Sequence, residues 1–197
     1  MNTKIVIIGG GFAGISFIEG MGGKSDDLSL TLVDPSPVSV FRPLLPDVIA
    51  GKVKLEHCRY SLPEFCRSRK VRYLQKSAVS LPDEKKCALD DGTVLDFDYL
   101  VMACGADPEY HGNQNARKHA LTLYSARDAV RLNNRVDEIL EREGDVSFVV
   151  VGGGYTGLET ATALKYRIGK KLGPVAADRL AVILAEGAQR MLSGVPE

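Results

Sequence analysis

Short runs of apolar residues alternate along this chain with segments in which apolar residues recur at helical intervals. Such runs are typical of strands buried on both faces of a parallel sheet. They predict strands at residues 5–8, 28–33, 71–74, 99–103, 146–151 and 180–185. The helical pattern predicts helices at residues 13–21, 44–50, 62–68, 125–143 and 156–166. This alternation predicts an α/β fold with parallel sheets.

Residues 77–97 follow a different period. Apolar and polar residues alternate there in three short segments, Ala78–Leu81, Cys87–Leu89 and Val94–Phe97, which are joined by a polar tip and by a turn at Asp90–Thr93. Alternation with turns of this kind predicts a small antiparallel meander. The order fits a Rossmann-like, doubly wound dinucleotide-binding domain with a β-meander inserted in its last crossover.

A glycine-rich turn follows the first predicted strand. Gly9, Gly11 and Gly14 have the spacing G-x-G-x-x-G, and Asp34 ends the next predicted strand twenty residues after Gly14. The glycines allow a tight turn, the approach of a pyrophosphate and close packing of helix on strand, and the acid accepts hydrogen bonds from ribose hydroxyls. A structural turn that binds nothing is the alternative.

The same motif returns in the second half of the chain. Gly152, Gly154 and Gly157 repeat the spacing after the strand at 146–151, and Glu186 ends the strand at 180–185. Two copies that each end in an acid are more specific than one, so the chain is predicted to hold two dinucleotides. Nicotinamide and flavin form a natural pair, because one donates a hydride and the other accepts it. Glu186 favours NADH over NADPH, since a 2′-phosphate would meet a like charge.

The repeat divides the chain into a first dinucleotide-binding domain at 1–110, a linker at 111–124 and an incomplete second domain at 125–197. Ser125 and Asp128 form a capping box that opens the helix after the linker. On that helix Arg127, Arg131 and Arg135 recur at intervals of four. They form either an anion-binding ridge or, as we favour, a solvated face interleaved with acids.

Composition excludes several other classes of protein. Lys and Arg together number 25, as do Asp and Glu, in a chain of 197 residues, so no electrostatic footprint for nucleic acid is present. We also expect no signal peptide and no membrane span. The four cysteines, Cys58, Cys66, Cys87 and Cys104, lie far apart and have no metal-ligand spacing. We therefore expect reduced thiols, no metal site and a cytoplasmic protein.

The segment FRPLLPDVIAG at residues 41–51 is apolar and stiffened by prolines, which is unusual for an exposed linker. It either covers a core or lines a pocket, and its own chemistry does not decide between them. A flavin on the first turn would extend its ring toward this segment and toward Ala103–Gly105.

At this point the chain resembles a known family of flavoproteins with two dinucleotide-binding domains, the pyridine nucleotide-disulfide oxidoreductase superfamily. It is most similar to the amino-terminal part of the type II NADH dehydrogenases (NADH:quinone oxidoreductases). The resemblance rests on IVIIGGGFAG, LTLVD, FRPLLPDVIAG, DYLVMACGA, SARDAVRLNNRVDEILE and VVVGGGYTGLETATAL. It implies a flavoprotein that transfers hydride from NADH to FAD and passes electrons to a quinone.

The resemblance also implies site residues. The residues expected to hold FAD, including the FRPLL segment beside its ring and adenine contacts near Val79, are Gly9, Gly11, Phe12, Ala13, Gly14, Asp34, Pro35, Arg42, Pro43, Leu44, Ala78, Val79, Ala103, Cys104 and Gly105. Those expected to hold NADH are Gly152, Gly154, Tyr155, Thr156, Gly157 and Glu186. Glu159 matches a glutamate near the nicotinamide and is the candidate catalytic residue. Its alternative role is to stabilise its own helix as a first-turn acid.

Other members of the superfamily fit less well. Disulfide reductases carry a redox cysteine pair soon after the first acid, and residues 34–50 contain no cysteine. Sulfide:quinone oxidoreductases use cysteines beyond the position of Cys104, where this chain has none. A protein of that kind remains the alternative, together with a nucleotide-binding module without turnover.

Family members are longer than this chain, so we expect it to be an amino-terminal fragment that is inactive by itself, holds FAD weakly and exposes one face of its second sheet. The family's carboxyl-terminal region makes contacts to quinone, membrane and a second copy. The whole protein is therefore expected to lie on the cytoplasmic membrane as a peripheral protein, and a homodimer is compatible with it.

Overall fold

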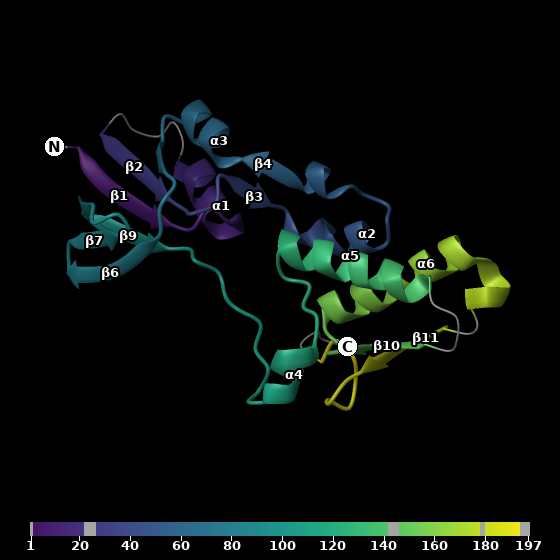
Figure 1. The fold of residues 1–197 in the computed structure, drawn as a ribbon. Coiled ribbons are helices and arrows are strands. Elements are labelled where there is room, and N and C mark those ends of the chain that lie inside the picture. Colours follow the sequence, from purple (N-terminus) through teal and green to yellow (C-terminus); the bar gives the residue numbers. More distant parts are fainter. Residues whose placement is uncertain (1, 22–26, 142–145, 178–179, 194–197) are drawn as a thin grey trace. The chain divides into compact units, whose positions relative to one another are not determined.

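A computed structural model describes residues 2–21, 27–141, 146–177 and 180–193 (Figure 1). Contacts group the chain into two compact units, which are Met1–Phe41 with Arg59–Asp107 and Arg42–Cys58 with Pro108–Glu197. Residues 42–58 therefore join the second unit although the first unit flanks them on both sides. The first unit ends at Asp107. The fold is α/β with parallel sheets, as predicted.

The first unit is built on a four-stranded parallel sheet in the order β5-β2-β1-β9. Its strands are β1 (Thr3–Ile8), β2 (Leu28–Val33), β5 (Arg72–Leu74) and β9 (Tyr99–Met102). β1 pairs with β2 on one side and with β9 on the other, so the strand order reverses at β1. Open parallel sheets bind ligands beyond the carboxyl ends of their strands at such a reversal.

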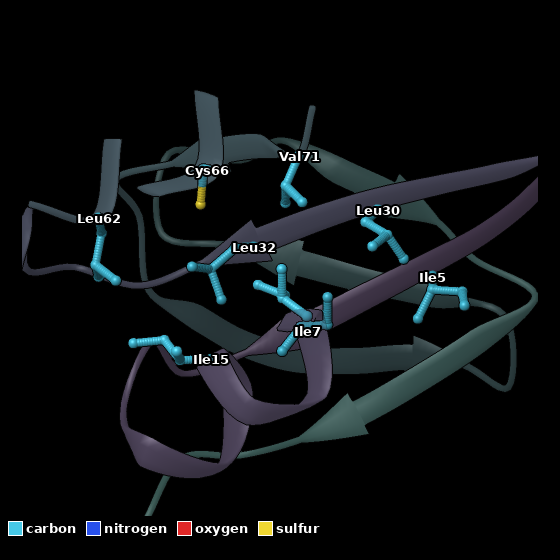
Figure 2. Packing of buried hydrophobic residues seen from close by; sticks show 9 residues of the cluster. Ile5, Ile7, Ile15, Leu30, Leu32, Leu62, Cys66 and Val71 are labelled. Atoms are coloured by element: carbon cyan, nitrogen blue, oxygen red, sulfur yellow. The ribbon is translucent and has the colours of Figure 1, made fainter. Parts of the chain in front are cut away.

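Alternate residues of β1 pack into two different cores. Ile5 and Ile7 face a cluster that includes Ile15 of α1 (Phe12–Met21) and Leu62 of α3 (Leu62–Ser68) (Figure 2). Val6 and Ile8 face the other cluster, which contains Cys87, Leu89, Leu95 and Phe97. Burial on both faces explains why β1 is continuously apolar.

The predicted meander lies between β5 and β9 in the chain. Its strands pair antiparallel in the order β6 (Ala78–Asp83), β7 (Lys86–Leu89) and β8 (Val94–Asp96). β6 continues through Pro82, where the sequence predicts a polar tip. A proline is compatible with β6 because this strand lies at the edge of its sheet.

Two short strands have no counterpart in the sequence prediction. β3 (Val38–Val40) and β4 (Arg59–Ser61) pair antiparallel, with Val40 opposite Arg59. Each strand has three residues, which is too short for a period to be recognised. Their pairing brings together the two ends of the segment that joins the second unit.

The second unit contains β10 (Val146–Val151) and β11 (Leu180–Ala185), which pair in parallel within the predicted bounds. Helix α6 (Tyr155–Ala177) connects them and continues well beyond the predicted end at Tyr166. Ile168 extends its buried face, and Gly173 interrupts it with a φ of 77°.

Helix α5 (Ala126–Leu140) begins at the predicted capping box. The Ser125 hydroxyl accepts the Asp128 N–H at 3.1 Å, and the Asp128 carboxylate accepts the Ser125 N–H at 2.8 Å. The predicted linker contains one further helix, α4 (Gln114–His119), which is capped by the side chain of Asn113. On α5, Arg135 donates to Glu138 at 2.8 Å, and Arg127 and Arg131 are exposed, which favours the solvated face.

The FRPLLPDVIAG segment, for which the sequence leaves core cover and pocket lining open, is partly buried and partly exposed. It forms η1 (Arg42–Leu44) and α2 (Leu45–Ile49), followed by η2 (Leu55–Cys58). Leu45, Val48 and Ile49 are buried, and α2 contacts both α5 and α6. Phe41, Arg42 and Pro43 remain exposed. The second half of the segment is therefore core, and its first half is exposed.

The small sheet of the second unit has one covered and one open face. Val149, Val151 and Ile183 are exposed, while Phe148 and Leu184, which point to the other face, are half-buried. The expected exposure of one face of this sheet, within Phe148–Val150 and Val182–Leu184, is confirmed at Val149 and Ile183. None of the helices in the described ranges is long and apolar enough to cross a bilayer.

Candidate cofactor-binding site

The first glycine-rich turn joins β1 to α1 in a way that only glycine permits. Gly9 has a φ of +106°, which residues with a Cβ rarely adopt, and its N–H donates to the carbonyl oxygen of Val33 at 2.9 Å. A Cβ on Gly14 would overlap the carbonyl oxygen of Gly9. Helix α1 therefore starts in direct contact with the end of β1, which directs its first N–H groups toward the turn.

The second turn, between β10 and α6, repeats this geometry. Gly152 has a φ of +107°, and its N–H donates to the carbonyl oxygen of Ala185 at 2.8 Å. A Cβ on Gly157 would overlap the carbonyl oxygen of Gly152. The two halves of the chain thus contain equivalent strand–turn–helix units.

The middle glycines leave their turns open. Among the described atoms, apart from chain neighbours and local helix backbone, none lies within 4 Å of a Cβ built on Gly11 or Gly154. These are the positions at which the pattern expects a pyrophosphate to approach the backbone. Both turns therefore fit a dinucleotide.

Asp34 lies against the first turn. Its Oδ2 accepts the N–H of Gly10 at 2.6 Å, and its Oδ1 accepts the N–H of Ser36 at 2.8 Å. These bonds fix the carboxylate beside the glycines, where its remaining lone pairs are able to accept from a ribose.

Glu186 makes the corresponding contacts in the second turn. Its Oε2 accepts the N–H of Gly153, and its Oε1 accepts the N–H of Ala188 at 2.8 Å. Hydrogen bonds from Ala188 and Gly153 lower the pKa of the Glu186 carboxyl below its ordinary value. The side chain is therefore negatively charged at neutral pH.

Gly10 and Gly153 have no role in the sequence motif, yet both donate their N–H groups to the acids. A Cβ on Gly10 would lie 2.5 Å from Cδ1 of Leu62, and one on Gly153 would lie 2.8 Å from Oε2 of Glu186. A signal for this role is present, because each turn contains three consecutive glycines and the motif itself requires only the outer two.

The end of β9 closes the first turn on its other side. Ala103 donates its N–H to the carbonyl oxygen of Ile8 at 2.8 Å, and Cys104 Sγ lies 3.8 Å from the same oxygen. A Cβ on Gly9 would overlap the carbonyl of Ala103, and Gly105 has a φ of 76°. The predicted Ala103–Gly105 site and the first turn are therefore neighbours at the reversal of strand order.

Other candidates for FAD lie nearby in the chain or the sheet. Phe12 is 70% exposed at the start of α1, and its ring centroid lies 6.1 Å from that of Phe41. Ala78 packs against the core cluster that contains Val33, the residue before Asp34. The remaining candidates Ala13, Pro35 and Val79 are exposed.

The second turn has its own exposed residues. Tyr155, which occupies the place of Phe12 in the repeated motif, is 62% exposed, and Thr156 is exposed as well. Both stand at the start of α6, beside the open backbone of Gly154.

A cavity of about 330 Å³ in the second unit brings two predicted site residues together. It lies between η1–α2 and α6, and its lining residues are Pro43, Pro46, Asp47, Lys52, Leu158, Glu159, Thr162 and Ala163. Glu159 is the fifth residue of α6, beyond the first turn in which a helix dipole acts most strongly on a charge. This position favours a role in the cavity over stabilisation of the helix.

Two further residues of η1 lie away from this cavity lining. The guanidinium of Arg42 stacks on the ring of Tyr124, 4.1 Å from its centroid. Leu44 is half-buried and occupies the position before the first residue of α2.

The four cysteines differ in burial, and burial affects the reactivity of their thiols. Cys58, Cys66 and Cys87 are buried and Cys104 is exposed. Burial raises the pKa of the Cys66 thiol to about 11 and raises that of Cys87, which makes both less reactive. Within the described ranges, no group of three His, Cys, Asp or Glu residues is placed to hold a metal ion.

Comparison with known proteins identifies the family. Residues 3–197 match the family described as pyridine nucleotide-disulphide oxidoreductase. The chain belongs to this family. Its relatives are type II NADH:quinone oxidoreductases and similar enzymes.

Two relatives and one solved structure illustrate this similarity. The chain is 28% identical to the external alternative NAD(P)H-ubiquinone oxidoreductase B4 of Arabidopsis thaliana, over 82% of this chain and 31% of that protein. It is 31% identical to the type II NADH:quinone oxidoreductase NdhA of Mycobacterium tuberculosis, over 80% of this chain and 36% of that protein. The structure of NDH2 from Plasmodium falciparum in complex with NADH shares its fold, with a TM-score of 0.85 and 24% identity, over 100% of this chain and 44% of the other.

The chain thus spans about a third of the length of these two relatives. Equivalent glycine turns in both units agree with a family whose name refers to pyridine nucleotides.

Proposed function

We propose that the whole protein is a flavin-dependent NADH dehydrogenase that passes electrons to a quinone, with FAD on the first turn and NADH on the second. The observation that carries this proposal is the pair of equivalent turns, each with open backbone at its middle glycine and a carboxylate hydrogen-bonded within it. A protein that needed one dinucleotide would not require two such turns.

In this proposal the candidate site residues bind and position the two nucleotides. Bound FAD would supply the hydride acceptor and the route for electrons to the final acceptor. The first turn and Asp34 would bind the pyrophosphate and ribose of FAD, and Ala103–Gly105 would support its ring. The second turn and Glu186 would bind NADH, and Glu159 with Pro43 would position the nicotinamide at the cavity that they line. Exclusion of water from the reacting atoms favours direct hydride transfer.

The electron acceptor, membrane location and assembly are further parts of the proposal. The names of the relatives include quinone or ubiquinone, which supports a quinone acceptor. We propose a peripheral protein at the cytoplasmic face of the membrane that is able to form a homodimer. We expect the surfaces for these partners to lie outside the two glycine turns and outside the cavity that Pro43 and Glu159 line.

Anaerobic titration tests the activity. Addition of NADH to the purified whole protein should bleach the flavin absorbance, and a soluble quinone should restore it. A flavin that sulfide reduces and NADH does not would instead support the sulfide:quinone alternative. A protein that binds nucleotides without any bleaching would be a binding module.

Changing Glu186 to Gln should narrow the preference for NADH over NADPH by about three- to tenfold in kcat/KM, because the neutral amide no longer repels a 2′-phosphate. Since the pKa of Glu186 is lowered, the carboxylate stays ionised even as the pH falls toward the ordinary pKa of a glutamate. The charge of Glu186 should therefore be constant between about pH 6 and 8, and a change of the preference in that range would come from the 2′-phosphate, whose second pKa is about 6.

Steady-state kinetics with both nucleotides measure this ratio. Glu138→Gln, a change to an exposed acid on α5, is the matched control and should leave the ratio unchanged. A parent protein that prefers NADPH would contradict the assignment of Glu186 to the ribose.

A further inference from the structure

One arginine connects three helices of the second unit. Arg167 of α6 donates from Nη1 to the carbonyl oxygen of Ile49 at 3.0 Å and to Oδ1 of Asn133, and from Nη2 to Oδ2 of Asp137 at 2.6 Å. Its side chain is only 16% exposed. The planar fork of a guanidinium suits several acceptors at once. Arg167 thereby ties α6 to α5 and to the end of α2.

The end of α2 depends on such partners. The last carbonyl groups of a helix have no partner within it, and a buried carbonyl without a hydrogen bond is costly. In α2 these groups belong to Val48 and Ile49, which are buried. Asn133 Nδ2 donates to the carbonyl oxygen of Val48 at 3.4 Å, and Arg167 donates to that of Ile49. The carbonyl oxygen of Val48 also accepts the N–H of Gly51 at 3.1 Å, so Asn133 of α5 adds a second bond there. Arg167 of α6 supplies the bond that the helix lacks at Ile49.

The other end of α2 leads into the candidate site. Helix α2 has five residues and follows directly after η1, which contains Pro43. Pro43 and Pro46 line the cavity of about 330 Å³ together with Glu159 of α6 (α2 and α6 are labelled in Figure 1). Because α2 is short and follows η1 directly, a shift at its carboxyl end is expected to change the separation of Pro43 from Glu159.

We infer that Arg167 is a positioning residue for NADH oxidation, which holds α2 on α6 and thereby sets the width of the cavity between Pro43 and Glu159. The catalytic part of this inference rests on the proposed function. A shift of about 1 Å in such a site costs up to about a hundredfold in rate.

Charge alone does not account for the arrangement. Lys171 also donates to Asp137, at 3.1 Å, so this carboxylate keeps a cationic partner without Arg167. A lysine at position 167 would preserve the charge beside Asp137 but would lack the fork that reaches Ile49 and Asn133 together. Arg167→Lys therefore separates loss of charge from loss of position.

A larger cavity of about 870 Å³ is lined by residues 50–56, which follow α2, and by residues of α5 and α6. Lys54 lies 3.7 Å from Glu56, Lys171 lies 3.1 Å from Asp137, and Arg167 is engaged as described. Most of its cations are thus already paired with acids, so its charge does not indicate an anion site.

The test compares Arg167→Ala and Arg167→Lys with Arg135→Ala in the whole flavin-loaded protein. Arg135 is a matched control because it forms an ion pair on α5 at 2.8 Å and is 45% exposed. Stopped-flow absorbance gives the rate constant of flavin reduction and the dissociation constant of NADH. Amide hydrogen exchange of peptides covering residues 43–58 reports on α2 independently of activity.

Arg167→Ala should raise exchange in residues 45–58 by about tenfold or more, as expected when a buried contact is lost. It should lower the flavin-reduction rate by about ten- to hundredfold, while the dissociation constant of NADH changes by less than about threefold. Arg167→Lys should reduce the rate by an intermediate factor, and Arg135→Ala should behave as the parent protein.

Three outcomes would overturn the inference. One is unchanged exchange in residues 45–58. Another is a lower melting temperature with a parental reduction rate for the folded protein, which would leave Arg167 a purely structural role. If Arg167→Ala does not fold, a parental rate in Arg167→Lys would have the same meaning. A parent flavin that NADH does not bleach would refute the proposed function and the catalytic part of the inference, while the exchange result would still decide whether Arg167 holds α2.

Discussion

Replacing Gly14 with alanine is expected to weaken FAD binding to the whole protein by about ten- to hundredfold. The new Cβ would overlap the carbonyl oxygen of Gly9, so α1 must move away from the end of β1. Overpacking of this kind costs about 1–3 kcal/mol, and each tenfold change in affinity corresponds to about 1.4 kcal/mol. Fluorescence titration of the apoprotein with FAD measures the loss.

Gly20→Ala is the control for this prediction. Gly20 lies on the same helix, and among the described atoms, apart from chain neighbours and local helix backbone, none is within 4 Å of a Cβ built there. Alanine should keep FAD affinity at the parental value and stabilise α1 by about 0.5–1 kcal/mol. Parental FAD affinity in Gly14→Ala would show that the first turn is not the site of the pyrophosphate.

Replacing Gly157 with alanine is expected to yield a protein that remains yellow but is reduced poorly by NADH. Its Cβ would overlap the carbonyl oxygen of Gly152 and displace α6 from β10. The same range of strain predicts an increase of about ten- to hundredfold in the dissociation constant of NADH, with little change for FAD. Stopped-flow reduction at a series of NADH concentrations measures it.

Gly169→Ala provides the comparison on the same helix, since a Cβ there has no described atom within 4 Å other than chain neighbours and local helix backbone. It should bind NADH as the parent does. If Gly157→Ala lost FAD instead of NADH, the order of the two nucleotides along the chain would have to be reversed.

The parts of the fold that sequence predicts well are those with a strong local period. The strands β2, β10 and β11 have the predicted bounds, because continuous apolar runs reflect burial between layers. The pair β3–β4 has no such signal, since three-residue strands are defined by partners about twenty residues away. The length of α6 is underestimated because Arg167 and Lys171, which are polar, engage Asp137 of α5 on one side of the helix.

The candidate site also has some features that the sequence predicts and others that depend on tertiary structure. The glycine turns and the two acids are predictable, because backbone conformation at a turn restricts residue type at the turn itself. The bonds from Gly10 and Gly153 to the acids depend on which strand lies next to the turn, and this is a tertiary property. The packing of Leu45–Ile49 against α5 and α6 is also a tertiary property, because apolar residues do not specify which apolar partner they pack against.

The path of the chain through its two units restricts how the protein is divided for experiments. The backbone passes from one unit to the other after Phe41, after Cys58 and again after Asp107. A truncation after residue 107 would retain Leu45, Val48 and Ile49 but remove the helices that bury them. Separate expression of the first unit therefore calls for excision of residues 42–58 and a short turn between Val40 and Arg59, which the β3–β4 ladder already holds side by side.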